Sequence, residues 1–249
     1  MFGSTRKRQL PNPKNLGAME AFTNEKTISF GLKRLNQRQT HTQERNRILR
    51  LPVANLKKRG FDLTVSCLIT LCILIWLFPI VALLIKFTSK GPIFYVQLRT
   101  GRRGTVFPCL KFRTMTYDRN APFQQAVVND QRITPIGRFL RRTNLDEMPQ
   151  FLNVLVGHMS VVGPRPHPLP LDAQHWNTIP GYQERYSVKP GITGLAQVRG
   201  ARGETAEVHR MKTRVRYDHL YIRRQSTRLD VKICWLTVMS TLKGHENAR

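Results

Sequence analysis

The amino-acid sequence predicts an α-rich α+β fold, in which a re-entrant membrane helix precedes a compact domain with a small β-hairpin and interfacial helices. Three observations lead to this prediction. A long uncharged apolar segment contains a proline, two short strand-like segments flank a glycine-containing turn, and apolar residues elsewhere recur at helical spacing. At 249 residues, the chain is long enough for one domain with an appendage.

The composition is strongly basic. The chain has 41 Lys and Arg residues against 15 Asp and Glu, a formal net charge of +26. Such a charge indicates a polyanionic partner: nucleic acid, anionic lipid or a phosphorylated substrate. The four cysteines have no metal-ligand spacing, so we expect a reducing compartment and no disulfide framework.

Residues 1–55 are predicted to form a basic, flexible N-terminal arm. They are rich in Arg, Lys, Asn, Gln and Thr and show little apolar periodicity. No apolar segment follows the early basic residues, so a secretory signal peptide is excluded. The arm is interpreted as a solvated tail, with attraction to an anionic membrane surface as an addition.

Residues 56–90 contain the membrane segment. Leu63 to Ile85 carries no charge over 23 residues, enough to span a bilayer. Pro79 lies inside this segment and should interrupt the helix. Both flanks are basic, and the positive-inside rule assigns both to the cytoplasm. We therefore expect a re-entrant helix-break-helix; a single crossing and a buried helix of a soluble protein are the alternatives.

Residues 91–249 are predicted to form the second domain, which begins with a β-hairpin. Ile93–Arg99 and Val106–Phe112 are strand-like segments on either side of the turn at 100–104. The second strand carries Lys111 near its end, a position suited to binding phosphate. Residues 116–134 are polar and irregular, which predicts a loop.

The stretch Pro135–Pro166 holds the only adjacent acidic pair, Asp146-Glu147. Apolar residues at helical spacing precede and follow the pair, and Gly157 is placed to end the second helix. Asn144 and Asp146 are alternative N-caps, and both alternatives leave the two acids in the first helical turn. The pair is either a helix-stabilising feature or a site. The helix dipole and nearby arginines predict that Asp146 stays ionised well below neutral pH.

The remaining sequence predicts a rigid arginine and two helices. Arg165 lies between two prolines, which lowers the entropy lost when its guanidinium binds an anion. Residues 168–180 are expected to be irregular, and 189–203 to form turns whose glycines allow close backbone approach. Residues 206–222 and 229–242 are predicted helices. The second is apolar almost all round, typical of a packing or an interfacial helix.

Eight motifs occur here in one order: KRGFD, GPIFYVQLRTGRRG, KFRTM, GRFLRRTNLDEMPQFLNVLVG, SVVGPRP, KPGITGLAQV, RGET and YDHLYI. Together they closely resemble the bacterial sugar transferase family of polyprenyl-phosphate hexose-1-phosphate transferases, which are monotopic phosphoglycosyl transferases. The resemblance covers residues 56–243 and is strongest to members that initiate exopolysaccharide assembly.

The resemblance implies transfer of a hexose-1-phosphate from a nucleotide-diphosphate sugar, expected to be a UDP-sugar, to polyprenyl (undecaprenyl) phosphate. In such enzymes the carboxylate matching Asp146 attacks phosphorus, UMP leaves, and a sugar-phosphoryl aspartate forms. The residue matching Glu147 completes the dyad, and Mg²⁺ is the implied cofactor, with both acids as its ligands. The cations expected to bind substrate phosphate are Lys111, Arg141 and Arg165.

The implied location is the bacterial inner membrane, with the catalytic domain on its cytoplasmic face and anionic lipids as further partners. No nucleic acid is expected as a partner. The alternatives are a basic nucleic-acid-binding protein and an inactive scaffold derived from a transferase. Two departures from the family pattern stand out: Phe78 precedes Pro79 where the family usually has serine, and His158 stands where an aspartate is often seen.

Overall fold

The computed structural model describes residues 56–118, 124–127, 129–201 and 208–243, all within one compact unit, Pro52–Arg249. The predicted basic arm, residues 1–55, lies outside the described residues, as does the RGET motif. The predicted α-rich α+β character is confirmed: helices predominate, and the described strands form a two-stranded hairpin and a two-stranded parallel pair.

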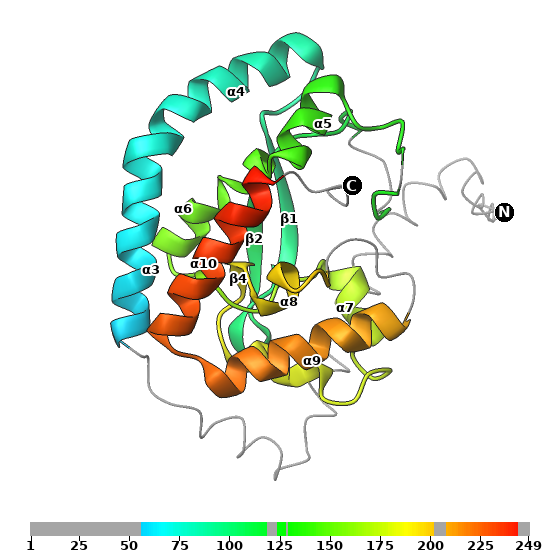
Figure 1. Cartoon of the computed structure of the whole chain (residues 1–249). Coiled ribbons are helices and arrows are strands. Elements are labelled where there is room, and N and C mark those ends of the chain that lie inside the picture. Colours follow the sequence, from blue (N-terminus) through cyan, green and yellow to red (C-terminus); the bar gives the residue numbers. More distant parts are fainter. Residues whose placement is uncertain (1–55, 119–123, 128, 202–207, 244–249) are drawn as a thin grey trace, which may run out of the picture. The chain divides into compact units, whose positions relative to one another are not determined.

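The apolar segment forms one continuous helix instead of the predicted helix-break-helix. Helix α3 (Leu56–Ile69), a π-helical turn (Thr70–Leu74) and helix α4 (Ile75–Thr88) follow one another without interruption. In the π turn the N–H of Ile75 donates to the carbonyl of Thr70, an i→i−5 bond. Pro79 removes a donor inside α4, and the wider turn just before it takes up the distortion. The result is a bend between α3 and α4 (Figure 1).

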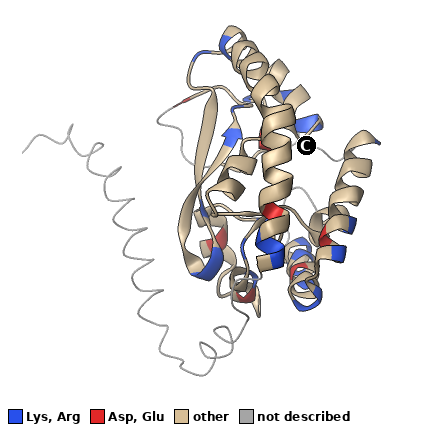
Figure 2. Cartoon of the chain, turned by 90° about the vertical axis from the view of Figure 1, so that its left-hand side faces the viewer, with Lys and Arg blue, Asp and Glu red and all other residues tan. Residues whose placement is uncertain are grey.

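This helix is long and apolar enough to cross a membrane, with 33 residues from Leu56 to Thr88. Its charged residues lie near its two ends (Figure 2). Large apolar side chains point away from the protein, among them Trp76, which is 71% exposed. On the opposite face Val81 and Ile85 are buried against Leu140, so one side of the helix packs on the domain and the other remains uncovered by it.

The predicted hairpin is confirmed. Strands β1 (Phe94–Thr100) and β2 (Val106–Phe112) pair antiparallel, with Tyr95 opposite Lys111. The ring of Phe78 stacks on that of Phe94, with 5.4 Å between centroids. Phe78, which replaces the family's usual serine, therefore packs helix α4 onto the hairpin.

A second, unpredicted sheet joins β3 (Ser160–Val162) to β4 (Gly191–Thr193) in parallel. The expected close approach of glycines is confirmed here, because a Cβ on Gly191 would lie 2.1 Å from the nitrogen of Gly163. The stretch expected to be irregular contains helix α7 (Leu169–His175). Its first turn includes a proline, which a helix tolerates because N–H groups there have no intrahelical acceptor.

The other helices complete the unit, and most of them follow the predicted apolar spacing, whereas Leu195–Val198 is helical within a stretch expected to form turns. They are α5 (Pro135–Arg142), α6 (Gln150–Leu155), α8 (Leu195–Val198), α9 (Val208–Arg224) and α10 (Thr227–Leu242), with 3₁₀ turns η3 (Arg102–Gly104), η4 (Leu145–Glu147) and η5 (Tyr182–Ser187). The main core joins β2, α6, β3, α9 and α10 through Phe107, Val154, Val161, Tyr221 and Ile233. This core holds the hairpin against the turn that carries the acidic pair.

Candidate active site

The acidic pair lies in the 3₁₀ turn η4 between α5 and α6. Asn144 precedes it in the left-handed conformation, with φ of 57°. Its side chain caps no helix; its amide lies 3.4 Å from the hydroxyl of Thr241. Pro149, with no side-chain cap bond, occupies the N-cap position of α6. Asn144 therefore stands at the start of η4, as one of the two predicted alternatives had it, but its side chain makes no cap bond. The alternative that Asp146 is the cap is wrong, because Asp146 lies inside the 3₁₀ turn.

Glu147 is bound by two cations from distant parts of the chain. Lys111 Nζ donates to Glu147 Oε1 at 2.7 Å, and Arg165 Nη1 donates to Oε2 at 2.9 Å. Arg165 Nη2 also donates to Oε1, which makes the arginine contact bidentate. Burial raises the pKa of Glu147, but the charges of Arg165 and Lys111 outweigh this and hold it well below its usual range. Glu147 is therefore a fixed negative charge.

Asp146 has a different environment. It is 8% exposed, and its carboxylate is 3.9 Å from Lys111 Nζ. Burial raises the pKa of Asp146 to about 6, opposed by Lys111 and reinforced by the negative charge of Glu147. The expectation that Asp146 stays ionised well below neutral pH is wrong, because desolvation outweighs the attraction of the cations. Within the described part of the chain, no hydrogen-bond donor holds this carboxylate.

The other predicted cation, Arg141, does not contact the acids. Its Nε donates to Thr114 Oγ1 at 2.8 Å. Its charge still lowers the pKa of Asp146. The structure thus gathers Asp146, Glu147, Lys111 and Arg165 at one place, and Arg141 acts on Asp146 only through its charge.

Two residues that support this site were missed from the sequence. Asn153 donates to the carbonyl of Pro108 at 2.7 Å and accepts from the N–H of Leu110 at 2.9 Å, which fixes α6 to β2. A side-chain amide that is buried among apolar helix residues needs hydrogen-bond partners, so the position of Asn153 in the sequence could have indicated a structural role. Arg99 is buried and donates to the carbonyl of Pro166 at 2.7 Å. No local pattern distinguishes it from the other hairpin cations.

The donor atoms fit a magnesium ion only in part. Among the described residues, no three His, Cys, Asp or Glu side chains gather as a metal site. Glu147 fits poorly as a ligand, because its oxygens already accept from Arg165 and Lys111. Asp146 fits better: Mg²⁺ commonly takes one or two carboxylates together with substrate phosphates. The site therefore suits an ion that is held mainly by a diphosphate.

Comparisons with known proteins show the family of the chain. The family described as "Bacterial sugar transferase" matches residues 53–244. A "UDP-glucose:undecaprenyl-phosphate glucose-1-phosphate transferase" of Klebsiella pneumoniae is 46% identical over 208 residues, covering 80% of this chain and 45% of the relative. The protein of that name from Escherichia coli (strain K12) is 46% identical over 199 residues, covering 78% of this chain and 41% of the relative.

A shorter relative matches nearly end to end. The "Exopolysaccharide production protein PSS" of Rhizobium leguminosarum bv. phaseoli is 44% identical over 190 residues, covering 74% of this chain and 94% of the relative. The chain spans less than half the length of the first two relatives but almost all of this one. By the extent of the family match and this near-complete relative, the chain belongs to the bacterial sugar transferase family.

Proposed function

We propose that this chain transfers a hexose-1-phosphate from a UDP-sugar to undecaprenyl phosphate and releases UMP. The observation that carries the proposal is the difference between the two adjacent acids. Glu147 is held by two cations, whereas no described residue donates a hydrogen bond to the Asp146 carboxylate, which lies 3.9 Å from Lys111 Nζ. Such a carboxylate is suited to attack phosphorus, because no hydrogen bond from a described residue ties up its oxygens and one oxygen can react even if the other holds a metal ion.

The reaction proceeds in two displacements. An oxygen of Asp146 forms a bond to the β-phosphorus of the donor, the bond from that phosphorus to the bridging oxygen breaks, and UMP leaves with the electron pair. A phosphate oxygen of the polyprenyl acceptor then attacks the same phosphorus and releases the Asp146 carboxylate. Lys111 and Arg165 stabilise the negative charge that develops on the phosphoryl oxygens.

Magnesium is part of the proposal as a diphosphate-bound cofactor. Asp146 is the residue that would hold it together with the donor, and the ion supplies charge neutralisation of the diphosphate when bound. In this proposal Glu147 does not bind the ion. Its role is to hold Lys111 and Arg165 in place through two ion pairs.

The apolar helix supports a substrate with a lipid tail. Leu145 and Met148, on either side of the acidic pair, pack with Val81 and Ile85 of α4 and with Phe112, next to Lys111. The site and the membrane-length helix therefore share one core. We propose that this helix is re-entrant in the inner membrane, with its bend at the π turn Thr70–Leu74, and that the site faces headgroups on the cytoplasmic side. Anionic lipids would contact the basic residues at its ends.

The test is the donor half-reaction with a panel of radiolabelled UDP-sugars, with UDP-glucose first because of the relatives' names. Without acceptor, the enzyme should release UMP in an amount no larger than the enzyme present and retain sugar label on Asp146. Adding undecaprenyl phosphate should move the label to lipid. Asp146→Asn should abolish both events.

The possible failures are distinct. Lipid product without any protein-bound label would favour direct attack by the acceptor and contradict the covalent step. No product from any donor would indicate an inactive scaffold. Arg142→Ala serves as a matched control. Arg142 is an exposed cation next to Arg141, and its removal should leave both half-reactions unchanged.

A further inference from the structure

The backbone around Arg165 is held through its carbonyl groups. The flanking prolines have no N–H to donate, so this segment cannot be fixed by an ordinary strand ladder. Three successive carbonyls instead accept bonds from separate elements. These are Pro164 O from the N–H of Gly191 at 2.9 Å, Arg165 O from Arg185 Nη2 at 2.7 Å, and Pro166 O from Arg99 Nη1 at 2.7 Å.

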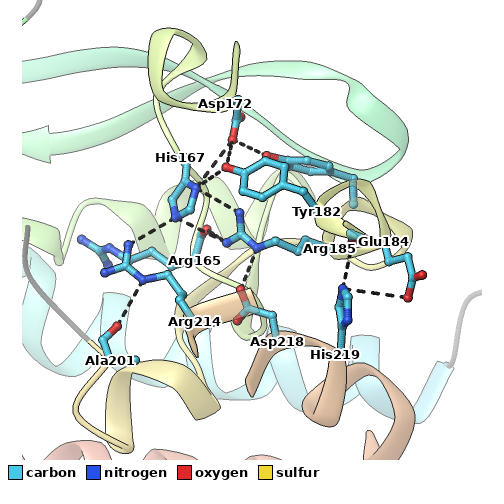
Figure 3. Close-up of polar contacts among 12 residues, drawn as sticks. Arg165, His167, Asp172, Tyr182, Glu184, Arg185, Ala201, Arg214, Asp218 and His219 are labelled. Atoms are coloured by element: carbon cyan, nitrogen blue, oxygen red, sulfur yellow. Dashed lines mark hydrogen bonds and ion pairs between the residues drawn. The ribbon is translucent and has the colours of Figure 1, made fainter. Parts of the chain in front are cut away.

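Arg185 reaches Arg165 from the 3₁₀ turn η5 and is itself fully engaged (Figure 3). Its Nε donates to Asp218 Oδ2 of α9 at 2.7 Å, and its Nη1 lies 3.0 Å from His167 Nδ1. Its side chain is 1% exposed. Because all of its nitrogens have partners in a buried site, the guanidinium cannot turn without breaking several bonds.

Arg99 holds the next carbonyl in a similar way. It is buried on β1, and Gln97 Oε1 accepts from its Nε at 3.3 Å and its Nη2 at 2.9 Å. The guanidinium plane is therefore set by Gln97, and its remaining arm donates to Pro166. Two buried arginines thus donate hydrogen bonds to consecutive carbonyls, those of Arg165 and Pro166. The side chain of Arg165 is the one that binds Glu147.

We propose that Arg185 and Arg99 are positioning residues for sugar-phosphate transfer, which hold the Arg165 guanidinium on Glu147 and on the substrate phosphate. The inference rests on the proposed function, in which Arg165 stabilises phosphoryl charge. A long arginine side chain loses much entropy when it binds, and a fixed Cα reduces the number of positions that it samples. Displacement of a catalytic group by about 1 Å can cost about 100-fold in rate.

The first test is a double-mutant cycle between Arg185→Lys and Arg165→Ala, measured as kcat/KM for transfer. Lysine keeps the buried charge beside Asp218 but cannot donate to both Asp218 and the Arg165 carbonyl in the same fork geometry. In the wild-type background Arg185→Lys should reduce kcat/KM about 10- to 100-fold. In the Arg165→Ala background it should change kcat/KM by less than about twofold, because the group that it positions is absent.

A matched control uses another buried arginine of the same cluster. Arg214 donates to the carbonyl of Ala201 at 3.1 Å and lies 3.3 Å from His167 Nε2; in both of these contacts its partner is a group other than the Arg165 and Pro166 carbonyls. Arg214→Lys should lower the melting temperature and leave kcat/KM within about twofold of wild type. An equal loss of activity in Arg214→Lys would overturn the proposal, since any disturbance of the cluster would then suffice.

A second cycle keeps the proposal testable if Arg185→Lys does not fold. Gln97 is partly exposed on the hairpin, so Gln97→Met should fold while it releases Arg99. It should reduce kcat/KM with Arg165 present and have no effect in Arg165→Ala. No loss with Gln97→Met would overturn the proposal for Arg99, and equal losses in both backgrounds would mean a general structural role.

The design separates this inference from the proposed function. If Arg165→Ala keeps wild-type transfer, the role of Arg165 under the proposed function is wrong and the inference fails with it. If Arg165→Ala is impaired and Arg185→Lys is not, the inference alone is wrong.

Discussion

Asp146 and Glu147 are adjacent acids whose pKa values are shifted in opposite directions. Glu147 accepts hydrogen bonds from Arg165 and Lys111, which favour its charged form. Asp146 is similarly buried but has Lys111 only at 3.9 Å. Desolvation therefore raises the pKa of Asp146, whereas pairing with Arg165 and Lys111 lowers the pKa of Glu147. Glu147 thus fixes the two cations, and Asp146 is the acid that we propose as the nucleophile.

The rate of the donor half-reaction should follow the ionisation of Asp146. Since burial raises the pKa of Asp146 to about 6, single-turnover UMP release at a donor concentration far below saturation, which reports the free enzyme, should be half-maximal near that pH. Below that pH, the rate should fall by about tenfold for each pH unit. The donor's diphosphate does not titrate in this range, so it does not confuse the measurement. An unchanged rate between pH 8 and pH 5, with the fold intact by circular dichroism, would contradict an ionised Asp146 nucleophile.

Asp146→Asn should stabilise the protein at neutral pH. The folded pKa of Asp146 is about 6, above the ordinary value of 3.8, so its ionisation lowers the free energy of unfolding. The effect is full above about pH 6 and absent below about pH 4, where the carboxyl is protonated in both states. Its upper limit is about 3 kcal/mol, at about 1.4 kcal/mol per pH unit.

The measurement is the melting temperature in detergent at pH 7.5 and pH 4. Glu147→Gln is the matched comparison and should have the opposite sign at pH 7.5, because it leaves Arg165 and Lys111 without their acid. A lower melting temperature for Asp146→Asn than for wild type at pH 7.5 would show that its ionised form is stabilising.

At the scale of elements, the parallel pair β3–β4 brings Arg165 to the site. The pair places the segment that follows β3 directly against β4, where the N–H of Gly163 donates to the carbonyl of Thr193 at 2.9 Å. Side chains at Gly163 and Gly191 would occupy the space between the two backbones. The position of Arg165 therefore depends on glycines in two distant motifs.

Gly191→Ala should destabilise the protein severely, because the new Cβ would lie 2.1 Å from the nitrogen of Gly163 and the strands must separate. We expect a loss of more than about 3 kcal/mol, typical of backbone strain in a packed site. Gly60→Ala is the control: a Cβ there meets nothing within 4 Å, and alanine in helix α3 should gain up to about 1 kcal/mol. Equal melting temperatures for the two variants would contradict the close approach.

Helix α3–α4 shows how an element adjusts to one residue. Pro79 bends this helix through the π turn at Thr70–Leu74 without ending it. Phe78 then packs on Phe94 of the hairpin. Phe78, where the resemblance leads us to expect serine, thus adds an aromatic contact between α4 and the hairpin.

At the scale of the whole molecule, basic residues flank the apolar helix at both of its ends. The positive-inside rule therefore predicts that both ends lie on the same, cytoplasmic side of the membrane. Leu56 is 82% exposed at its start, and Arg138 is exposed on α5. In a cysteine-free background, Leu56→Cys and Arg138→Cys should both resist a membrane-impermeant maleimide in intact cells and react after permeabilisation. Labelling of only one of them from outside would establish a crossing helix and contradict the re-entrant proposal.

Local patterns in the sequence were enough to determine several features of this protein. Alternation with a glycine-containing turn predicted the hairpin, and helical spacing predicted α5, α6, α9 and α10, because these signals depend on neighbours within a few residues. The motif order identified the family. The acidic pair and the cations Lys111 and Arg165 were also visible, since acids are rare in so basic a chain.

Only the tertiary structure decided how these residues work together. Lys111 and Arg165 lie 36 and 18 positions from Glu147 in sequence. No local pattern indicates that both donate hydrogen bonds to Glu147 while Asp146 has only the longer contact to Lys111. The pKa of Asp146 depends on burial by elements that the local sequence does not contain. Strand pairing of β3 with β4, and the buried arginines behind Arg165, likewise depend on long-range contacts. Composition and spacing thus determine which groups are present, and packing decides which of them carry charge and where they point.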